Sequence, residues 1–413
     1  MPVTRPGPRR ARAVAVLTLL LLAACSPVPY ASPGPDGPGP AASDPIPIAT
    51  LAPTDPPIPG HELYGYLPYW EMDDEGIAGH LADTPLTTLA LFSVTHARGG
   101  ALNQDARGYG IVAGEPGRRL IDEAHERGVR VELVYTSFGA TRNRRLLEDP
   151  ALQGRVIASL VSLADELGVD GINVDIEALD AMLVPAYATF VGDLRGAVVD
   201  ADPSDQVSVA TGASGLGAAM AAAAAAVGAD RLFMMGYDYR TGRSEPGASA
   251  PLDRSDGGTA SLRTSLDVYQ ALGVPADRLL LGLPLYGVDW PVAGPVVGAP
   301  STGSGEAWFP RAHVDLLQDD AAVPQRDEVE QVDVYFLGSD GSVGAPSIAP
   351  GASLETRTWR GIYVDSPATL APKLALANER GLAGAGFWAI GYERGLPGYT
   401  RLMERFTEGK PLP

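Results

Sequence analysis

From about residue 61 onward, short apolar stretches alternate with longer segments in which apolar residues recur every three or four positions. The short stretches are rich in β-branched and aromatic residues and predict buried strands, whereas the longer ones predict amphipathic helices. The predicted strands are 63–69, 86–94, 129–136, 169–176, 206–211, 231–237, 278–286 and 384–390. The predicted helices are 117–127, 150–167, 183–199, 216–227, 261–272 and 368–380.

Strands that alternate with helices along a chain favour a parallel sheet, and this number of strands predicts an α/β fold of the (β/α)8 barrel type. A doubly wound sheet is the alternative, although no Gly-x-Gly-x-x-Gly run opens a helix after the first strand to support dinucleotide binding. Residues 288–362 are too many for a loop between the last two strands. Because they include a hairpin-like pattern, they predict a small α+β insertion at the barrel mouth.

The first 25 residues have the pattern of an export signal. Four arginines precede an apolar run over residues 13–24, which is of signal-peptide length and too short to span a bilayer. The run ends in Leu-Ala-Ala-Cys25, which resembles a bacterial lipobox, where the cysteine is lipidated; a chance cysteine is the alternative. Cys25 is the only cysteine, so no internal disulfide can form. These features predict an exported lipoprotein at the outer face of a bacterial membrane.

Residues 26–60 are dense in Pro, Gly, Ser and Ala, a composition that favours an extended linker without a core. The linker leads to one globular domain over residues 61–408, which we expect to be a monomer. Removing residues 1–24, which hold four arginines and no acid, takes the net charge from −19 to −23. This charge argues against nucleic acid or an anionic membrane surface as a partner, but leaves neutral sugars possible.

Residues 170–177 read Asp-Gly-Ile-Asn-Val-Asp-Ile-Glu and close the fourth predicted strand. Side chains alternate along a strand, so Asn173, Asp175 and Glu177 share one face. The two carboxylates are about 7 Å apart at the Cα level. Burying acids side by side is costly unless their chemistry is used, while a solvated strand end is the alternative interpretation.

The octet resembles the Asp-x-x-Asp-x-Asp-x-Glu signature on the fourth barrel strand of glycoside hydrolase family 18, with Asn173 in place of the second Asp. The resemblance extends over roughly residues 61–405. Other predicted strand ends resemble family motifs in the same order: the opening strand Tyr64-Gly65-Tyr66-Leu67-Pro68-Tyr69-Trp70, then Met235-Gly236-Tyr237-Asp238, then Gly282-Leu283-Pro284-Leu285-Tyr286-Gly287, and finally Trp388 at the position of the tryptophan below the sugar.

The resemblance implies a retaining hydrolase that cleaves β-1,4-linked N-acetylglucosamine glycans, meaning chitin oligomers or peptidoglycan. In such an enzyme the N-acetyl oxygen of the substrate itself is the nucleophile. Glu177 would be the general acid and then the base, Asp175 would orient the acetamido group, and Tyr237 would donate to its oxygen. A negative Asp175 would help keep Glu177 protonated, since like charges resist joint ionisation. The implied substrate-binding residues are Asp170, Asn173, Asp238, Tyr286, Trp388 and Trp70. We expect no cofactor and no metal.

Asn173 departs from the family pattern: it can hydrogen-bond Asp175 but cannot take its proton, so the pH profile is expected to differ. Asn also stands here in bacterial members of the spore-cortex-lysin type. Two other functions remain open, a non-catalytic sugar-binding lipoprotein and an endo-acting enzyme on N-linked glycans. Members that became lectins usually lose the acid that this chain keeps as Glu177. After the second strand, His96 and Arg98 could line the cleft or lie in a solvated loop.

Overall fold

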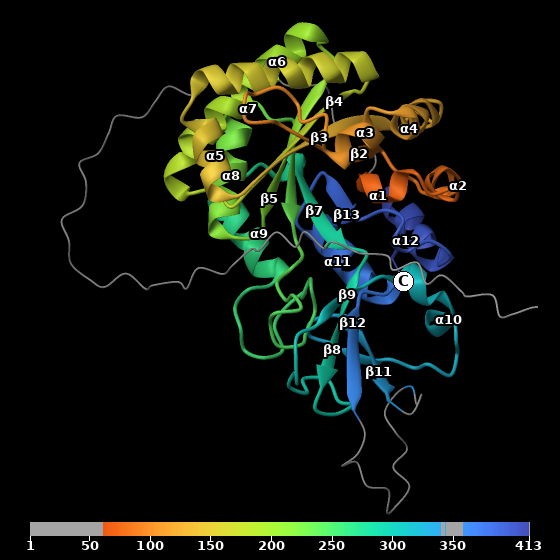
Figure 1. Cartoon of the computed structure of the whole chain (residues 1–413). Coiled ribbons are helices and arrows are strands. Elements are labelled where there is room, and N and C mark those ends of the chain that lie inside the picture. Colours follow the sequence, from red (N-terminus) through yellow and green to blue (C-terminus); the bar gives the residue numbers. More distant parts are fainter. Residues whose placement is uncertain (1–60, 340–342, 344–357, 413) are drawn as a thin grey trace, which may run out of the picture. The chain divides into compact units, whose positions relative to one another are not determined.

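The structure is a computed structural model that describes residues 61–339, 343 and 358–412; the predicted signal segment, Cys25 and the linker to residue 60 lie outside these ranges. Eight parallel strands close into a barrel (Figure 1), because β1 pairs with both β2 and β13. The barrel prediction is confirmed. The strands are β1 (Glu62–Pro68), β2 (Thr88–Thr95), β3 (Arg130–Phe138), β4 (Gly171–Glu177), β5 (Gln206–Gly212), β6 (Arg231–Met235), β7 (Leu279–Pro284) and β13 (Gly384–Trp388).

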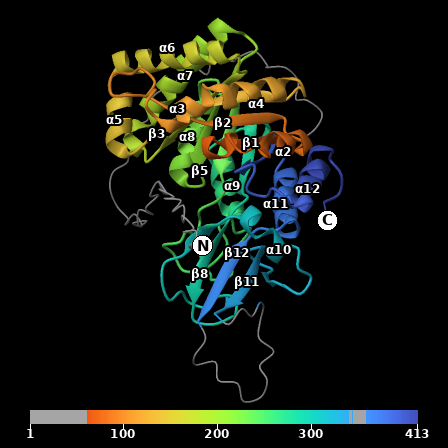
Figure 2. The ribbon, with the colours of Figure 1, turned by 45° about the vertical axis from the view of Figure 1, so that its right-hand side comes forward.

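Helices cover the outside of the barrel (Figures 1 and 2). The long ones occur where the sequence predicts them: α4 (Glu115–His125), α6 (Pro150–Leu167), α7 (Val184–Ala201), α8 (Gly215–Ala226), α9 (Leu262–Ala271) and α11 (Pro367–Glu379). The sequence does not predict the others: α1 (Tyr69–Met72), α2 (Ile77–Asp83), α3 (Arg107–Val112), α5 (Ala140–Leu147) and α12 (Pro397–Thr407). Short 3-10 turns are η1 (Ala181–Leu183) and η2 (Ala276–Arg278).

The ends of α6 illustrate why the long helices can be predicted from the sequence. The Asp149 side chain accepts a hydrogen bond from the backbone N–H of Leu152 at 3.0 Å, and Pro150 occupies the first turn, where it costs no hydrogen bond. Gly168 closes the helix at φ 68°, a conformation that favours glycine. Capping therefore fixes where the chain turns into β4, the strand that carries the acidic octet.

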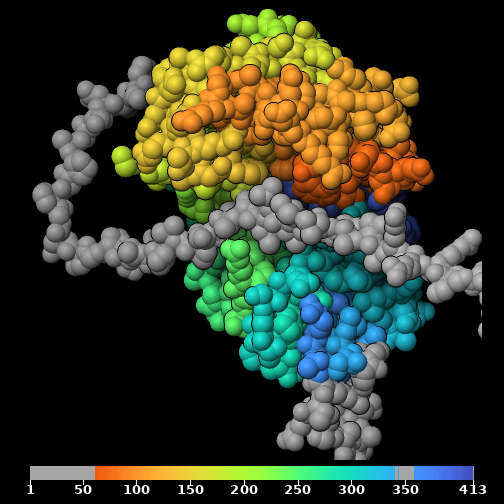
Figure 3. Space-filling model, in the orientation of Figure 1, coloured from red at the N-terminus to blue at the C-terminus, as the bar shows by residue number. Residues whose placement is uncertain are grey.

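The segment of the chain between β7 and α11, where the sequence predicts an insertion, forms a second sheet. It is antiparallel, with strand order β10-β11-β12-β8-β9, and has its own apolar core around Trp290 and Phe336. Figure 3 shows it in teal and blue as a lobe beside the barrel helices, which are orange and yellow. Its elements are β8 (Gly287–Val292), β9 (Glu306–Trp308), η3 (Pro310–His313), α10 (Val314–Leu317), β10 (Gln325–Asp327), β11 (Val332–Gly338) and β12 (Trp359–Val364).

Candidate active site

The predicted acids lie at the carboxyl end of β4, which is the end that carries the active site in this type of barrel. Glu177 is the last residue of the strand and is half-buried, while Asp175 is 4% exposed two positions earlier. The N-terminal turn of α5 holds the strand end in place. Gly139 N–H donates to the Glu177 carbonyl oxygen at 3.3 Å, and the Asn143 side-chain amide donates to the same oxygen.

Asp175 is an acid in an unusual environment. Its Oδ1 is buried and has no hydrogen-bond partner among the residues that the structure describes. Burial, and secondly the neighbouring carboxylate of Glu177, raise the pKa of Asp175 well above its ordinary value. The two acids therefore resist joint ionisation, and Asp175 has an acceptor oxygen available for a ligand N–H.

Tyr237 and Asp238 follow the carboxyl end of β6. Burial, and then the neighbouring Tyr66, Tyr286 and Asp175, raise the pKa of Tyr237 well above its ordinary value. The Tyr286 hydroxyl donates to Asp238 Oδ1, and the Tyr237 and Tyr286 ring centroids are 6.3 Å apart. Three predicted residues, Tyr237, Asp238 and Tyr286, thus lie together just after the carboxyl ends of β6 and β7.

The backbone adopts a left-handed conformation at two positions, one after β4 and one after β6. Ala178, which follows Glu177, and Asp238, which follows Tyr237, each have φ 60°. Such a conformation costs a non-glycine residue on the order of 1–3 kcal/mol and is retained where the surroundings require it, often at functional sites. Both turns direct the chain away from the barrel directly after a predicted catalytic side chain.

Trp388 and Trp70 provide aromatic surface. Trp388 ends β13, and its ring centroid lies 4.7 Å from that of Phe92 and 6.5 Å from that of Trp70. Trp70 is 39% exposed, and its Nε1–H donates to the Tyr392 hydroxyl at 3.1 Å. Because the apolar face of a pyranose ring stacks well on such rings, both tryptophans are placed as a binding surface requires.

Asp170 does not belong to this site, so its assignment to substrate binding is wrong. It precedes β4, about 23 Å along the strand from Glu177 at the usual rise per residue. Its Oδ2 accepts from the Val131 backbone N–H at 2.7 Å and lies 2.9 Å from His125 Nε2. Asp170 therefore ties the amino ends of β3 and β4 to α4.

Asn173 is also corrected. Its side chain is fully buried inside the barrel, so it does not face a substrate. Its amide donates to Ser208 Oγ at 2.7 Å, and its Oδ1 accepts from the Tyr66 hydroxyl at 3.1 Å. The amide oxygen and one amide N–H are thus used within a layer of polar contacts, and Asp175 Oδ1 has no hydrogen-bond partner among the described residues, so the expected bond from Asn173 to that oxygen is not formed.

Glu132 on β3 is a member of this layer that the sequence analysis missed. It is 1% exposed, and its Oε2 accepts from the Tyr64 hydroxyl at 2.6 Å and from the Ser208 hydroxyl. A continuous chain of hydrogen bonds thus runs from Tyr66 through Asn173 and Ser208 to Glu132. The signal in the sequence was a single acidic residue within the apolar run that forms β3.

We expect Glu132→Gln to change how stability depends on pH. Burial raises the pKa of Glu132 above its ordinary value of 4.5, so its contribution to stability is complete below that value and is lost as pH rises through the folded-state pKa. Gln never ionises and can accept the same two hydrogen bonds. The stability of the variant relative to wild type should therefore increase from pH 4 to pH 8 in urea unfolding; a difference independent of pH would contradict this.

His96 is buried rather than solvated, which corrects one expectation for the loop after β2. Its Nδ1 lies 2.6 Å from the Tyr135 hydroxyl. Burial, and secondly the charges of Arg142 and Arg145, lower the pKa of His96 to about 4. Arg98 is exposed on the same loop.

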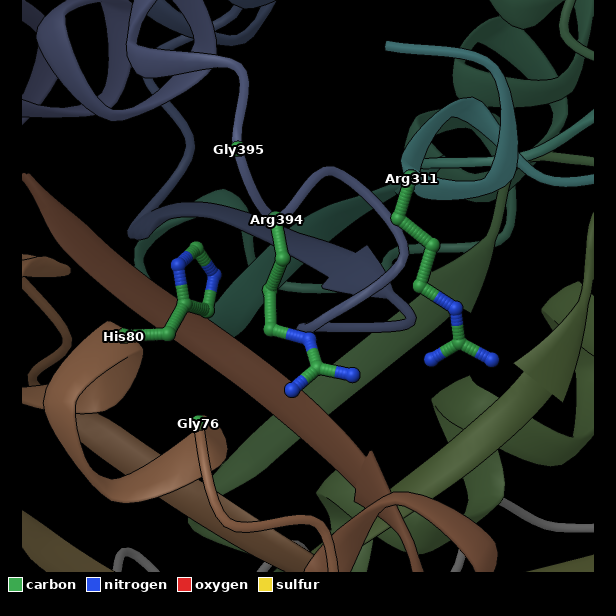
Figure 4. Close-up of a pocket in the computed structure, with 5 residues that line it drawn as sticks. All are labelled: Gly76, His80, Arg311, Arg394 and Gly395. Carbon is green, nitrogen blue, oxygen red and sulfur yellow. The ribbon is translucent and has the colours of Figure 1, made fainter.

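One cavity of about 420 Å³ lies apart from these residues, lined by Gly76, His80, Arg311, Arg394 and Gly395 (Figure 4). Its basic side chains come from α2, the insertion and the segment after β13. Each already has an acidic partner: His80 contacts Glu393, Arg394 contacts Asp74, and Arg311 contacts Glu71. None of the predicted site residues lines this cavity, so we do not regard it as the active site.

Known proteins resemble the chain in both sequence and structure. A class V chitinase of Lotus japonicus, CHIT5, is 29% identical over 165 residues, which are 39% of this chain and 37% of that protein. The spore cortex-lytic enzyme SleL of Bacillus cereus superposes with a TM-score of 0.65 at 19% identity, covering 84% of this chain and 74% of that one. A chitinase-like agglutinin of Robinia pseudoacacia gives 0.66 at 19% identity, covering 83% and 98%.

The matched segment spans well under half of the chitinase, and the two solved structures show similarity of fold alone. The family model for glycosyl hydrolases family 18 matches residues 62–393, which include the whole barrel and the octet. This chain therefore belongs to glycosyl hydrolases family 18.

Proposed function

We propose that the chain is a retaining, substrate-assisted glycoside hydrolase that cleaves β-1,4-linked N-acetylglucosamine glycans, either chitin oligomers or peptidoglycan. The observation that carries the proposal is the placement of Asp175 and Glu177 on one strand face at the carboxyl end of β4, with Tyr237 just after the carboxyl end of β6 in the same closed barrel. Family membership supports it, because this family uses the substrate's own N-acetyl group as nucleophile.

The first half of the reaction breaks the glycosidic bond. Glu177 gives its proton to the leaving oxygen while the acetamido oxygen attacks the anomeric carbon and forms an oxazolinium ring. Asp175 accepts the acetamido N–H through its available oxygen, and Tyr237 donates to the acetamido oxygen. Both contacts hold the nucleophile in line with the bond that breaks.

The second half restores the enzyme. Glu177, now a carboxylate, takes a proton from the water that attacks the same carbon and opens the ring. Two displacements at one carbon return the original configuration, so the product is retained in its β form. Trp388 supplies the surface on which the reacting sugar stacks.

A non-catalytic sugar-binding protein is the second candidate, because a chitinase-like agglutinin has a similar fold. The position of Glu177 favours an enzyme, since binding alone does not need a general acid beside Asp175. An endo-acting enzyme on N-linked glycans would use the same residues. The relatives include a chitinase and a cortex-lytic enzyme, so both neutral and acidic glycans are candidate substrates.

A substrate panel tests the proposal. Chitin hexamer, purified peptidoglycan and an N-linked glycan would each be incubated with the protein, and products carrying N-acetylglucosamine at the reducing end would be measured by mass spectrometry. We expect products from at least one of the first two. Binding of chitin hexamer without any product would favour the sugar-binding alternative, and products from the N-linked glycan alone would favour the endo-acting one.

We also propose that Cys25 is lipidated and anchors the enzyme to the outer face of a bacterial membrane, with residues 26–60 as a spacer. Buried acyl chains contribute about 0.8 kcal/mol per methylene group, so losing them should release the protein. In a bacterial host, Cys25→Ala is expected to move the chain from the membrane fraction to the soluble one. An unchanged distribution between the fractions would contradict the anchor.

A further inference from the structure

Arginines from two helices hold the loop that follows β2. On α5, Arg142 donates to the His96 carbonyl oxygen, and Arg145 Nη2 donates to that of Arg98 at 2.7 Å. On α6, Arg155 Nε donates to the Gly99 carbonyl oxygen at 2.7 Å. Arg98 itself belongs to this loop and is exposed, so four arginines are associated with one loop.

The arginine cluster consists of Arg98, Arg142, Arg145 and Arg155. The guanidinium groups of Arg142, Arg145 and Arg155 donate to backbone carbonyl oxygens of the loop, whereas the adjacent Arg144 pairs with both Glu148 and Asp180. The chain as a whole carries a net charge of −19, so four arginines beside one loop form a local basic patch on an acidic protein. Burial, and secondly the charges of Arg142 and Arg145, lower the pKa of His96 on the same loop.

The cluster lies at the same end of the barrel as the acidic pair. The loop leaves the carboxyl end of β2, and the Thr95 hydroxyl donates to the Thr136 carbonyl oxygen on β3 at 2.8 Å. The N-terminal turn of α5, which carries Arg142, also provides the two donors to the Glu177 carbonyl oxygen. In the contacts and in Figure 1, α5 lies next to α6. A glycan bound at Glu177 can therefore extend over this side of the barrel.

The N–H donors of these arginines that do not bind backbone carbonyl oxygens are suited to binding carboxylates. A guanidinium group has five N–H donors in a planar fork and binds carboxylates in two-point contacts. Arg145 and Arg155 each use one donor group on a backbone carbonyl, which fixes the side chain and leaves the rest of the fork available. Arg98, Arg145 and Arg155 are all exposed. A neutral glycan has no group that needs such a surface.

We propose that the arginine cluster binds carboxylates of the substrate, so that the preferred substrate class is an acidic N-acetylglucosamine glycan of the peptidoglycan type, not neutral chitin. Such a polymer carries carboxylates on its lactyl groups or stem peptides. The inference rests on the proposed function, because it assigns specificity to the same cleft. The arginines do not touch the reacting atoms, and their contribution is to binding.

The test compares an acidic with a neutral substrate. Arg145→Gln/Arg155→Gln would be assayed on soluble peptidoglycan fragments, on the same fragments with amidated carboxylates, and on chitin hexamer. We expect kcat/KM on the acidic fragments to fall about 10-fold or more through KM, since two charge-assisted contacts to the substrate are lost. Activity on chitin hexamer and on amidated fragments should stay within about twofold of wild type, and amidation alone should lower wild-type kcat/KM.

Arg127→Gln/Arg401→Gln is the matched control, because it removes two exposed arginines that lie outside the cluster. It should leave all three substrates unaffected. An equal loss on acidic and neutral substrates would indicate that the loop is damaged and would overturn the arginine proposal. A wild type that prefers chitin would overturn it too. Both results leave the proposed function in place. A wild type that cleaves none of the substrates would overturn both.

Discussion

Glu177→Gln should lower kcat on N-acetylglucosamine oligomers by about 10²–10⁴-fold, the usual contribution of a positioned general acid. Glutamine has the same shape but has no proton to give to the leaving oxygen. The contacts that hold the end of β4 should persist, because Gly139 and Asn143 bind the backbone carbonyl oxygen of residue 177. Initial rates by reducing-end assay, with oligomer binding by calorimetry, separate the loss of chemistry from the loss of binding.

Glu126→Gln provides the matched control, since it makes the same chemical change at an exposed residue of the α4 C-terminus. It should retain wild-type kcat. If Glu177→Gln keeps more than a tenth of wild-type turnover, Glu177 is not the general acid and the assigned mechanism is wrong.

Asp175→Asn is expected to lower kcat by about 10²–10³-fold, the usual effect of removing one group that stabilises charge in the transition state. It should also change the pH profile. Burial and the Glu177 carboxylate raise the pKa of Asp175, so the two acids oppose each other's ionisation. Without that opposing charge Glu177 should lose its proton more readily, and the alkaline limb of kcat/KM should move to lower pH.

The measurement is kcat/KM between pH 4 and pH 9 for wild type and Asp175→Asn on the same oligomer. An alkaline limb that does not move, or that moves to higher pH, would show that the two acids are not coupled. Asp180→Asn serves as the control, because Asp180 follows the same strand but is exposed and pairs with Arg144.

The barrel could be predicted because its strands are buried on both faces and therefore appear as compact apolar runs bounded by polar residues. The missed α5 has the sequence Ala-Thr-Arg-Asn-Arg-Arg-Leu-Leu, in which only a few residues face the core. Its stability comes from packing against neighbouring elements, which no local pattern records.

The site could be predicted in part. Alternation along β4 correctly placed Asp175 and Glu177 on one face, but it does not tell which end of a strand is the active one or how deep a side chain lies. Asp170 and Asn173 are assigned to the substrate by the resemblance to the family signature, which does not show what each side chain contacts. Glu132 was missed because its partners Tyr64 and Ser208 come from strands far apart in sequence, which only barrel closure brings together.

The most direct test of the account is the anomeric form of the first product. Chitin hexamer, or a soluble peptidoglycan fragment if that is the better substrate, would be cleaved in an NMR tube by the wild-type protein, and the anomeric proton signals of the new reducing end would be followed from the first minutes. Retention through the oxazolinium predicts that the β-anomer appears first and converts slowly to the equilibrium mixture. Initial formation of the α-anomer, or no product from either substrate, would contradict the account.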